Sequence, residues 1–113
     1  MIIRGFDAIS AAKHLHMPLG KYSEQSHTGF RLDLSIKEAD DLAIVDQNLI
    51  FLDLDISRLT VEELVALSVA LGGKPGESFN ELRDRFEMEG DDDRAEIFEA
   101  MARRWSELKL KSH

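Results

Sequence analysis

The spacing of apolar residues changes near residue 60, and this change most constrains how the chain can fold. Before it, residues 30–36 alternate apolar and polar side chains, the pattern of a half-buried strand. Residues 49–56 begin as a continuous apolar run and end in alternation, which predicts a second strand leaving the core. After residue 60 apolar residues recur at helical spacing. Strands followed by helices indicate the α+β class.

Three helices are predicted in the second half, over about 61–71, 79–89 and 92–110. The first two begin with a hydroxyl residue followed three positions later by glutamate, at Thr60 and at Ser78, which is the signature of a capping box. Glycines follow both helices and supply their stops. Apolar residues surround most of the helix over 61–71, so we expect it to be the buried one.

In the first half of the chain, the sequence is compatible with either a strand or a helix at residues 42–45. Residues 2–6 suggest a short strand, residues 7–17 a helix capped by Asp7, and residues 19–29 a polar, turn-rich loop. Ser35-x-x-Glu38 predicts a short helix through Leu42, whereas the β-branched content of residues 42–45 favours a strand. We favour the strand, which gives a three-stranded meander, and keep the helix as the alternative.

The expected fold is one domain over residues 1–113, because this length suits a single core without a disulfide. It is of the α+β class, with a small antiparallel sheet of about three to four strands, helices packed on one sheet face and a helical C-terminal half. One core is expected to contain Leu32, Leu34, Phe51, Leu64, Leu67, Phe98 and Trp105.

Composition narrows the classes of function. The chain has no cysteine, which removes thiol catalysis and thiolate metal sites. Its longest apolar run has four residues, too few for a signal peptide or a membrane span, so a cytoplasmic location without membrane contact is expected. The formal net charge of −8 opposes direct binding to nucleic acid, which requires a basic surface.

The negative charge is concentrated in residues 77–99, which hold ten acidic and three basic side chains, a net charge of −7. A helix N-terminus favours the aspartates at 91–93 but does not explain the glutamates of the preceding helix. One interpretation is a solvated helical face; the other is a surface that attracts a basic protein. The second predicts partner-binding roles for Glu81, Asp84, Glu87, Glu89, Asp91, Asp92, Asp93 and Glu96.

No catalytic residue, metal site or cofactor is predicted. Asp33, Asp53 and Asp55 occupy polar positions of two strands and would suit Mg²⁺ if the strands paired. We favour a solvated sheet face, and a contact surface for a partner is a further interpretation. His27, in the loop over 19–29, has no evident acid partner or nucleophile. Residues 72–76 are rich in glycine but follow a helix, so we interpret them as a helix stop rather than a phosphate loop.

A short acidic motif, Glu89-Gly90-Asp91-Asp92-Asp93, precedes the helix that carries the tryptophan. It resembles the acidic loop of the immunity proteins that inhibit nuclease colicins. The resemblance covers five residues; the paired tyrosines of that family's binding site are absent, and its fold is all-helical. It therefore illustrates a class, a small acidic protein that neutralises a basic one, and does not establish membership.

The leading functional hypothesis is a protein-binding module and not an enzyme: an immunity- or antitoxin-type inhibitor that occludes a basic partner such as a nuclease toxin. One alternative is a small enzyme or ligand-binding domain that uses the loop over 19–29 and the face formed by Asp33, Asp53 and Asp55. Another is a homo-oligomeric subunit whose helix over 79–89 packs against its own copy. The sequence identifies neither the partner nor the oligomeric state.

Overall fold

The computed structural model describes residues 1–17, 19–22 and 30–111, except for the side chains of 20–22, 30–33 and 111. The predictions for His27 and for burial of the Leu32 side chain therefore lie outside the described residues. Contacts between residues group the chain into two compact units, Met1–Leu54 and Asp55–His113, each described by itself below. The α+β class is confirmed. That the two units form a single domain stays a prediction.

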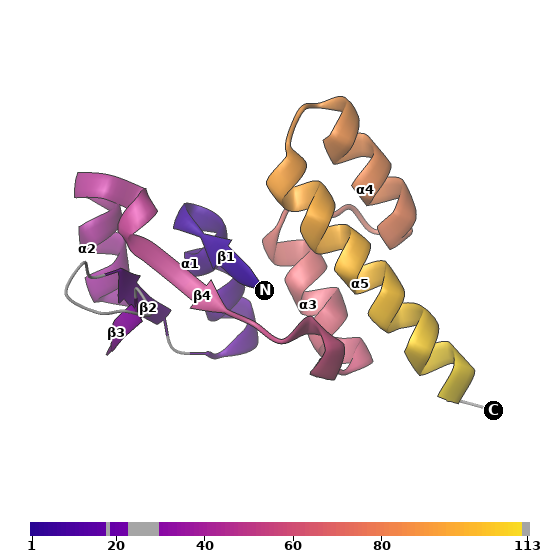
Figure 1. The fold of residues 1–113 in the computed structure, drawn as a ribbon, viewed down its shortest axis with the longest axis horizontal. Coiled ribbons are helices and arrows are strands. Elements are labelled where there is room, and N and C mark those ends of the chain that lie inside the picture. Colours follow the sequence, from indigo (N-terminus) through magenta and orange to yellow (C-terminus); the bar gives the residue numbers. More distant parts are fainter. Residues whose placement is uncertain (18, 23–29, 112–113) are drawn as a thin grey trace. The chain divides into compact units, whose positions relative to one another are not determined.

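The first unit combines strands and helices (Figure 1). Its strands pair in the order β1-β4-β2-β3, and each neighbouring pair is antiparallel. That the helices pack on one face of this sheet stays a prediction. The elements are β1 (Ile2–Arg4), α1 (Gly5–Leu15), β2 (Leu19–Tyr22), β3 (Phe30–Leu34), α2 (Ile36–Asp46), a 3-10 turn (Gln47–Leu49) and β4 (Ile50–Asp53).

The favoured strand over 42–45 is wrong, because these residues belong to α2. The Ser35 hydroxyl accepts a hydrogen bond from the backbone amide of Glu38 at 3.1 Å and caps the helix, as the alternative predicted. Ala39 and Ala43 form the buried side, whereas Ile44 and Val45 are 84% and 80% exposed. The β-branched side chains that suggested a strand thus point to solvent, where they do not decide the backbone conformation.

The start of the loop predicted over 19–29 is also wrong, because residues 19–22 form β2. Leu19 is buried and lies opposite Leu34 of β3, while Gly20 lies opposite Phe51 of β4. With a glycine and two polar or aromatic residues, this segment lacks the apolar alternation of a strand. Its hydrogen-bonding neighbours on both sides, which sequence cannot show, make it one.

Helix α1 begins earlier than predicted, at Gly5 rather than after Asp7. Gly5 has a φ of +66°, which an L-residue rarely adopts and which lets the chain turn directly from β1 into the helix. Asp7 lies in the first turn and does not cap it; the N-cap residue, Arg4, makes no side-chain capping bond. The helix ends at Leu15, and His16 follows in the left-handed conformation.

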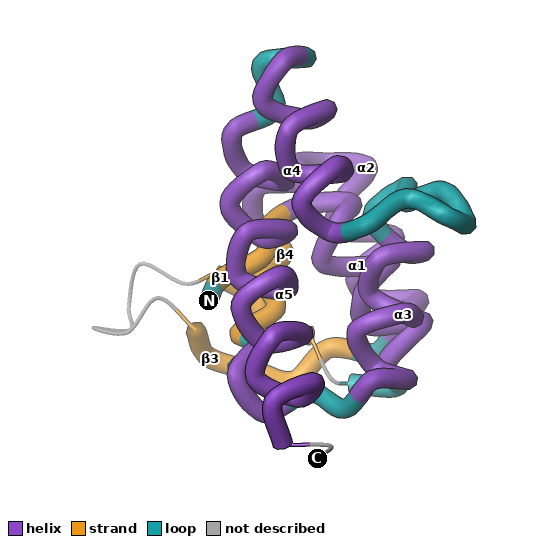
Figure 2. The backbone as a smooth tube through the Cα atoms, turned by 90° about the vertical axis from the view of Figure 1, so that its right-hand side faces the viewer, coloured by secondary structure: helices purple, strands orange, loops and turns teal. Residues whose placement is uncertain are grey.

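The second unit is helical, and short loops join its elements (Figure 2). The three predicted helices are confirmed, as is the capping box, in which Thr60 and Glu63 bond each other's backbone amides. The Ser78 hydroxyl caps the next helix by accepting from the amide of Glu81. The elements are a 3-10 turn (Ile56–Arg58), α3 (Val61–Ala70), α4 (Phe79–Met88) and α5 (Asp92–Lys111).

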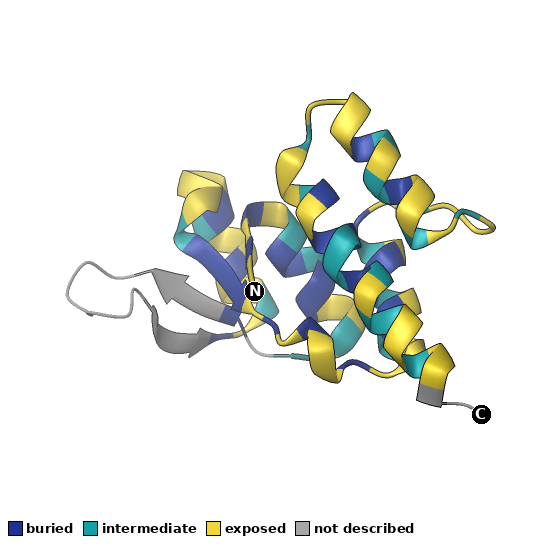
Figure 3. Cartoon of the chain, turned by 45° about the vertical axis from the view of Figure 1, so that its right-hand side comes forward, coloured by how far each residue is buried: buried dark blue, intermediate teal, exposed yellow. Residues whose placement is uncertain are grey.

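Helices α4 and α5 pack against each other as a helical hairpin (Figures 1 and 2). The rings of Phe86 and Phe98 stack with centroids 5.4 Å apart, and Leu82 and Met101 are fully buried. These apolar side chains repeat at three- and four-residue spacing, so each helix turns one face inward. Its other face, which bears most of the charge, remains in solvent (Figure 3).

Helix α3 is less buried than predicted. Leu64 and Leu67 are fully buried, but Val61, Val65 and Val69 are 41%, 50% and 54% exposed. The three valines follow one another at four-residue spacing and form a stripe along the outer side of the helix. We call them the valine stripe.

The residues predicted to share one core are divided between the units. Leu34 and Phe51 are buried in the first, whereas Leu64, Leu67 and Phe98 are buried in the second. Burial of these five side chains is confirmed, whereas Trp105 is only half-buried; that they share one core stays a prediction. Sequence periodicity shows which face of an element is buried and says nothing of which elements share a core.

We expect Phe98→Ala to lower the free energy of unfolding by about 3–5 kcal/mol, because the ring is fully buried and stacked on Phe86. Urea denaturation measures this. Met88→Ala is the control, since Met88 is 90% exposed and its removal should change stability by at most about 0.5 kcal/mol. Equal effects of the two substitutions would contradict the described packing of α4 on α5.

Candidate functional site

The acidic face of the hairpin follows from the packing of α4. Leu82 and Phe86 point to α5, so residues about half a turn away point to solvent. Glu81, Asp84 and Glu87 occupy this outer face at three-residue spacing, and all are exposed. The predicted gathering of carboxylates on one face of α4 is present in the structure.

The turn between α4 and α5 gives Asp91 a structural role. Its carboxylate accepts a hydrogen bond from the backbone amide of Arg94 at 3.1 Å, which caps α5, and lies 3.5 Å from Nε of the same arginine. Gly90, just before it, has a φ of +79° and completes the end of α4. The carboxylate of Asp91 is therefore engaged by its own helix. It is less available for contact with a partner than a free carboxylate would be.

The basic side chains of the acidic segment each face one carboxylate. Arg83 donates to Asp84 through Nε and Nη2, at 3.1 and 3.0 Å. Nε of Arg85 lies 3.6 Å from Glu77, and Nη2 of Arg85 donates to the carbonyl of Gly72. Asp84 is thus partly neutralised by its neighbour. Sequence reasoning did not predict these pairs, because they depend on the rotamers of long side chains.

Six of the eight predicted partner-binding carboxylates have no such contact within the hairpin. All are exposed, and within the described part of the chain no basic side chain forms an ion pair with them. An unexpected neighbour is Met88, the last residue of α4, which is 90% exposed between acidic residues. We call Met88 and these six residues the acidic tip: Glu81, Glu87, Glu89, Asp92, Asp93 and Glu96.

The alternative carboxylate face is not assembled as the sequence suggested. Strand β4 ends at Asp53, which lies 3.7 Å from the N-terminal ammonium group. Asp55 lies beyond the strand and caps a 3-10 turn, so it does not continue the alternation of β4. Asp33 lies in β3, which is separated from β4 by β2. No group of three or more His, Asp or Glu side chains within the described ranges is arranged to hold a metal ion.

Asp55 has a local role that explains its place in the sequence. The Ser57 hydroxyl donates to its carboxylate at 2.5 Å, and this bond holds the pKa of Asp55 below its ordinary value. The Ser57 amide and the charge of Arg58 act in the same direction. A carboxylate bound in this way stabilises the turn before α3.

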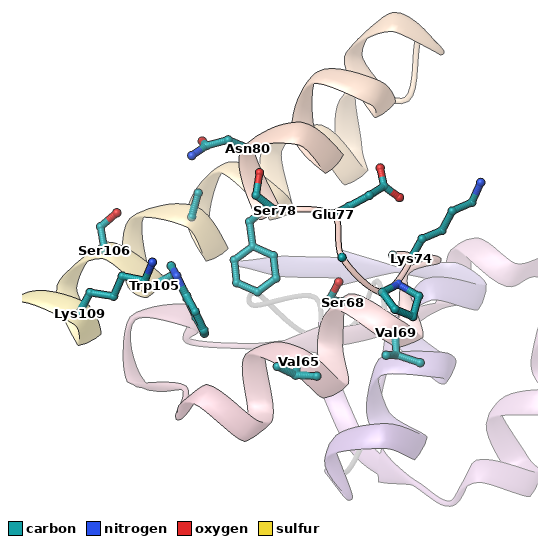
Figure 4. A pocket seen from close by; sticks show the side chains of 15 residues that line it. Val65, Ser68, Val69, Lys74, Glu77, Ser78, Asn80, Trp105, Ser106 and Lys109 are labelled. Atoms are coloured by element: carbon teal, nitrogen blue, oxygen red, sulfur yellow. The ribbon is translucent and has the colours of Figure 1, made fainter. Parts of the chain in front are cut away.

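A second candidate site is an apolar groove of about 650 Å³ in the second unit. Its walls come from α3, from the loop over 72–78 and the start of α4, and from the second half of α5 (Figure 4). A volume of this size is typical of a binding site. We call it the groove; its lining residues that matter below are Val65, Val69, Lys74, Phe79, Trp105 and Lys109.

Trp105 lines the groove and is only half-buried, which corrects its prediction as a core residue. The edge of its ring meets Phe79, with centroids 5.5 Å apart and planes at 86°. The Nζ atom of Lys109 lies 5.5 Å from the centroid of the indole, one turn along α5. The groove thus presents an aromatic surface with a cation beside it.

The loop over 72–78 forms a firm wall of the groove. The amide of Gly73 donates to the carbonyl of Ser68 at 2.8 Å, and a side chain at residue 73 would collide with Ser68 and approach Leu82. The glycine is needed so that the loop can lie against α3. The prediction of a helix stop at residues 72–76 is confirmed; that this stop lines a groove was not predicted.

Comparisons with known protein families, with curated proteins and with solved structures found no significant match to this chain. Among the described residues, no helix is both long enough and apolar enough to cross a membrane. The function is therefore argued from the geometry of the acidic tip and the groove.

We expect Asp91→Ala to lower the free energy of unfolding by about 0.5–2 kcal/mol through loss of the helix cap, measured by thermal or urea denaturation. Asp91→Asn should recover most of the loss, because an amide oxygen accepts the same bond. Glu96→Ala serves as the control and should alter stability little. If Asp91→Ala were as stable as the wild type, the structural role of Asp91 would be refuted.

Proposed function

We propose that this chain is a protein-binding module and that the acidic tip of the α4–α5 hairpin binds a basic partner. The observation that carries the proposal is the 90% exposed Met88 together with six carboxylates that no described basic side chain neutralises. An apolar side chain within a charged rim has the composition of a protein–protein contact. The narrower form is an immunity- or antitoxin-type inhibitor of a partner such as a nuclease toxin.

Inhibition would occur by occlusion. A nuclease holds phosphates with lysine and arginine side chains, and carboxylates placed at the same positions compete with the nucleic acid for them. The tip needs no catalytic group for this, so the proposed module is not an enzyme. Its negative field would also accelerate encounter with a basic surface.

The spacing of the carboxylates supports a use beyond solubility. Residues three or four apart on a helix lie roughly 5–6 Å apart, which is inside the screening length of about 8 Å at physiological ionic strength. Like charges at this spacing repel one another in the free protein. A basic partner offsets that repulsion when it binds. The complex therefore gains electrostatic free energy at these positions.

The eight predicted residues do not contribute equally to the proposed partner contact. Asp84 is paired with Arg83 and Asp91 caps α5, so both serve the hairpin first. The acidic tip carries the partner contact. The homo-oligomeric alternative loses support, because the apolar stripe of α4 packs on α5 of the same chain.

A ligand-binding domain is the second candidate, and the groove is the observation that favours it. The site differs from the one expected for this class, since it involves neither residues 19–29 nor Asp33, Asp53 and Asp55. Most residues of the acidic tip lie near the α4–α5 turn, whereas the groove is lined by the start of α4 and the second half of α5, so the two candidates are compatible.

The test is a variant with Glu87→Lys, Glu89→Lys and Asp92→Lys, measured against the partner that a pull-down with the wild-type chain identifies. We expect affinity to fall by more than about tenfold, mainly through slower association, and the dependence on salt to weaken. Stopped-flow or surface-plasmon kinetics at several salt concentrations measure both. Circular dichroism should show an unchanged fold, since the three side chains are exposed.

The matched control is Glu38→Lys, Asp41→Lys and Glu62→Lys, which changes the net charge equally at exposed sites elsewhere. It should leave the association rate within a few-fold of the wild type. If both variants slowed association equally, net charge rather than the acidic tip would be responsible. If neither changed binding, the acidic segment would be only a solvated face.

A further inference from the structure

We propose that the groove binds a small molecule that carries an aromatic ring system. The inference deepens the second candidate function, ligand binding, and rests on it. It does not depend on the acidic tip, because the residues that carry it are the aromatic and apolar side chains that line the groove.

A row of aromatic rings leads from the core of the second unit to the groove. Phe86 and Phe98 are buried and stack with centroids 5.4 Å apart. Phe79 follows with its centroid 6.4 Å from that of Phe98, and Trp105 with its centroid 5.5 Å from that of Phe79. All these separations lie within the roughly 4.5–7 Å at which aromatic rings attract one another. The row ends at a half-buried indole in the groove, where an aromatic ligand would add one further ring.

The two sides of the groove are apolar. Phe79 and Trp105 turn toward α3, which contributes Val65 and Val69 (Figure 4). The valines are 50% and 54% exposed, so neither is covered by the rest of the chain. A molecule held here would contact rings on one side and valine methyl groups on the other. Burial of this apolar surface on both partners favours binding.

The volume of the groove suits a small molecule. About 650 Å³ is the volume that roughly twenty water molecules occupy in the liquid, at about 30 Å³ each. Sites for small molecules typically have roughly 300–1,000 Å³, are mostly apolar and commonly lie between helices. The groove matches this class in its size, in its lining and in its place between α3 and the hairpin.

The groove is also preformed. The Gly73 amide is bonded to the Ser68 carbonyl, and Arg85 donates to the carbonyl of Gly72 at 3.2 Å, so the loop over 72–78 is held where it leaves α3. The cap at Ser78 fixes the other end of this loop. A wall that is already ordered loses little conformational entropy when a ligand binds.

The probes are naphthylmethanol and decahydronaphthylmethanol, two uncharged molecules with the same carbon skeleton. Equilibrium dialysis against the whole chain measures the affinity of each. Burial of apolar area alone would bind the saturated molecule at least as tightly as the aromatic one. We expect both to bind in a saturable manner, and the aromatic probe to bind at least about threefold more tightly because its rings contact Phe79 and Trp105.

The two probes distinguish failure of the inference from failure of the candidate function. Saturable binding of both without preference for the aromatic probe would overturn the inference and leave ligand binding as a candidate. Saturable binding of neither would overturn both.

A pair of variants at Trp105 assigns the preference to the row of rings. Trp105→Leu removes the last ring, so the two probes should bind with affinities within about twofold of each other. Trp105→Phe keeps a ring at this position and should keep the preference. Because Trp105 is half-buried, circular dichroism checks that both variants fold. An undiminished preference in Trp105→Leu would contradict the role of the row.

A second pair, on α3, locates the probes without altering any ring. Val69→Glu places a carboxylate in the groove and should weaken binding of the aromatic probe by more than about tenfold, because the probe would strip water from that charge. Val61→Glu makes the same change on the valine stripe but outside the groove lining, and should leave the affinity within about twofold. Equal losses in the two variants, or no loss in Val69→Glu, would refute the site.

Two further measurements address charge and self-association. Since both probes are uncharged, Lys74→Gln should leave their affinities within about twofold of the wild type. A larger loss would mean that this side chain, rather than the rings, holds the ligand. In sedimentation equilibrium the wild type should show no self-association that Val69→Glu abolishes. If it did, a second copy of the chain would occupy the groove and the proposal would be wrong.

Discussion

The second unit depends on one interaction, the packing of α4 on α5 through Phe86 and Phe98. Because these rings and their neighbours occupy the inner faces, the carboxylates of the hairpin lie on its outer faces, in contact with solvent. The same packing carries Phe79 to the side of Trp105 and so creates the aromatic wall of the groove. The charged outer face of the hairpin and the aromatic wall of the groove are two results of a single contact.

Sequence predicted the helices of the second half well because their starts are encoded locally. A hydroxyl side chain at Thr60 or Ser78 bonds an amide three residues away, so no distant contact is needed. It failed for β2, where the deciding factor is not local, and for α2, where the β-branched residues 42–45 were given more weight than the local cap at Ser35. Ile44 and Val45 imitate a strand but are solvated, and β2 exists only because β3 and β4 bond it from either side.

The acidic surface was visible in the sequence and the groove was not. Charge counts and helical spacing place the carboxylates, but the contacts that engage Asp84 and Asp91 within the hairpin require coordinates. The groove joins α3 and the loop after it to the distant second half of α5, which no motif connects to them. One signal for it was present and was misinterpreted: a helix apolar on most sides, α3, was expected to be buried within the chain, whereas its valine stripe is open to a partner.

Helix α5 has acidic residues at its start, Asp92 and Asp93, and basic ones further along, Arg103 and Arg104. Together with the carboxylates of α4, this arrangement gives the second unit a permanent electric dipole directed along its longest helix. In the field of a strongly charged body such a unit experiences a torque as well as a force. A basic surface would therefore turn the hairpin so that its α4–α5 turn arrives first, and the rotational search that slows most encounters would be shortened before contact.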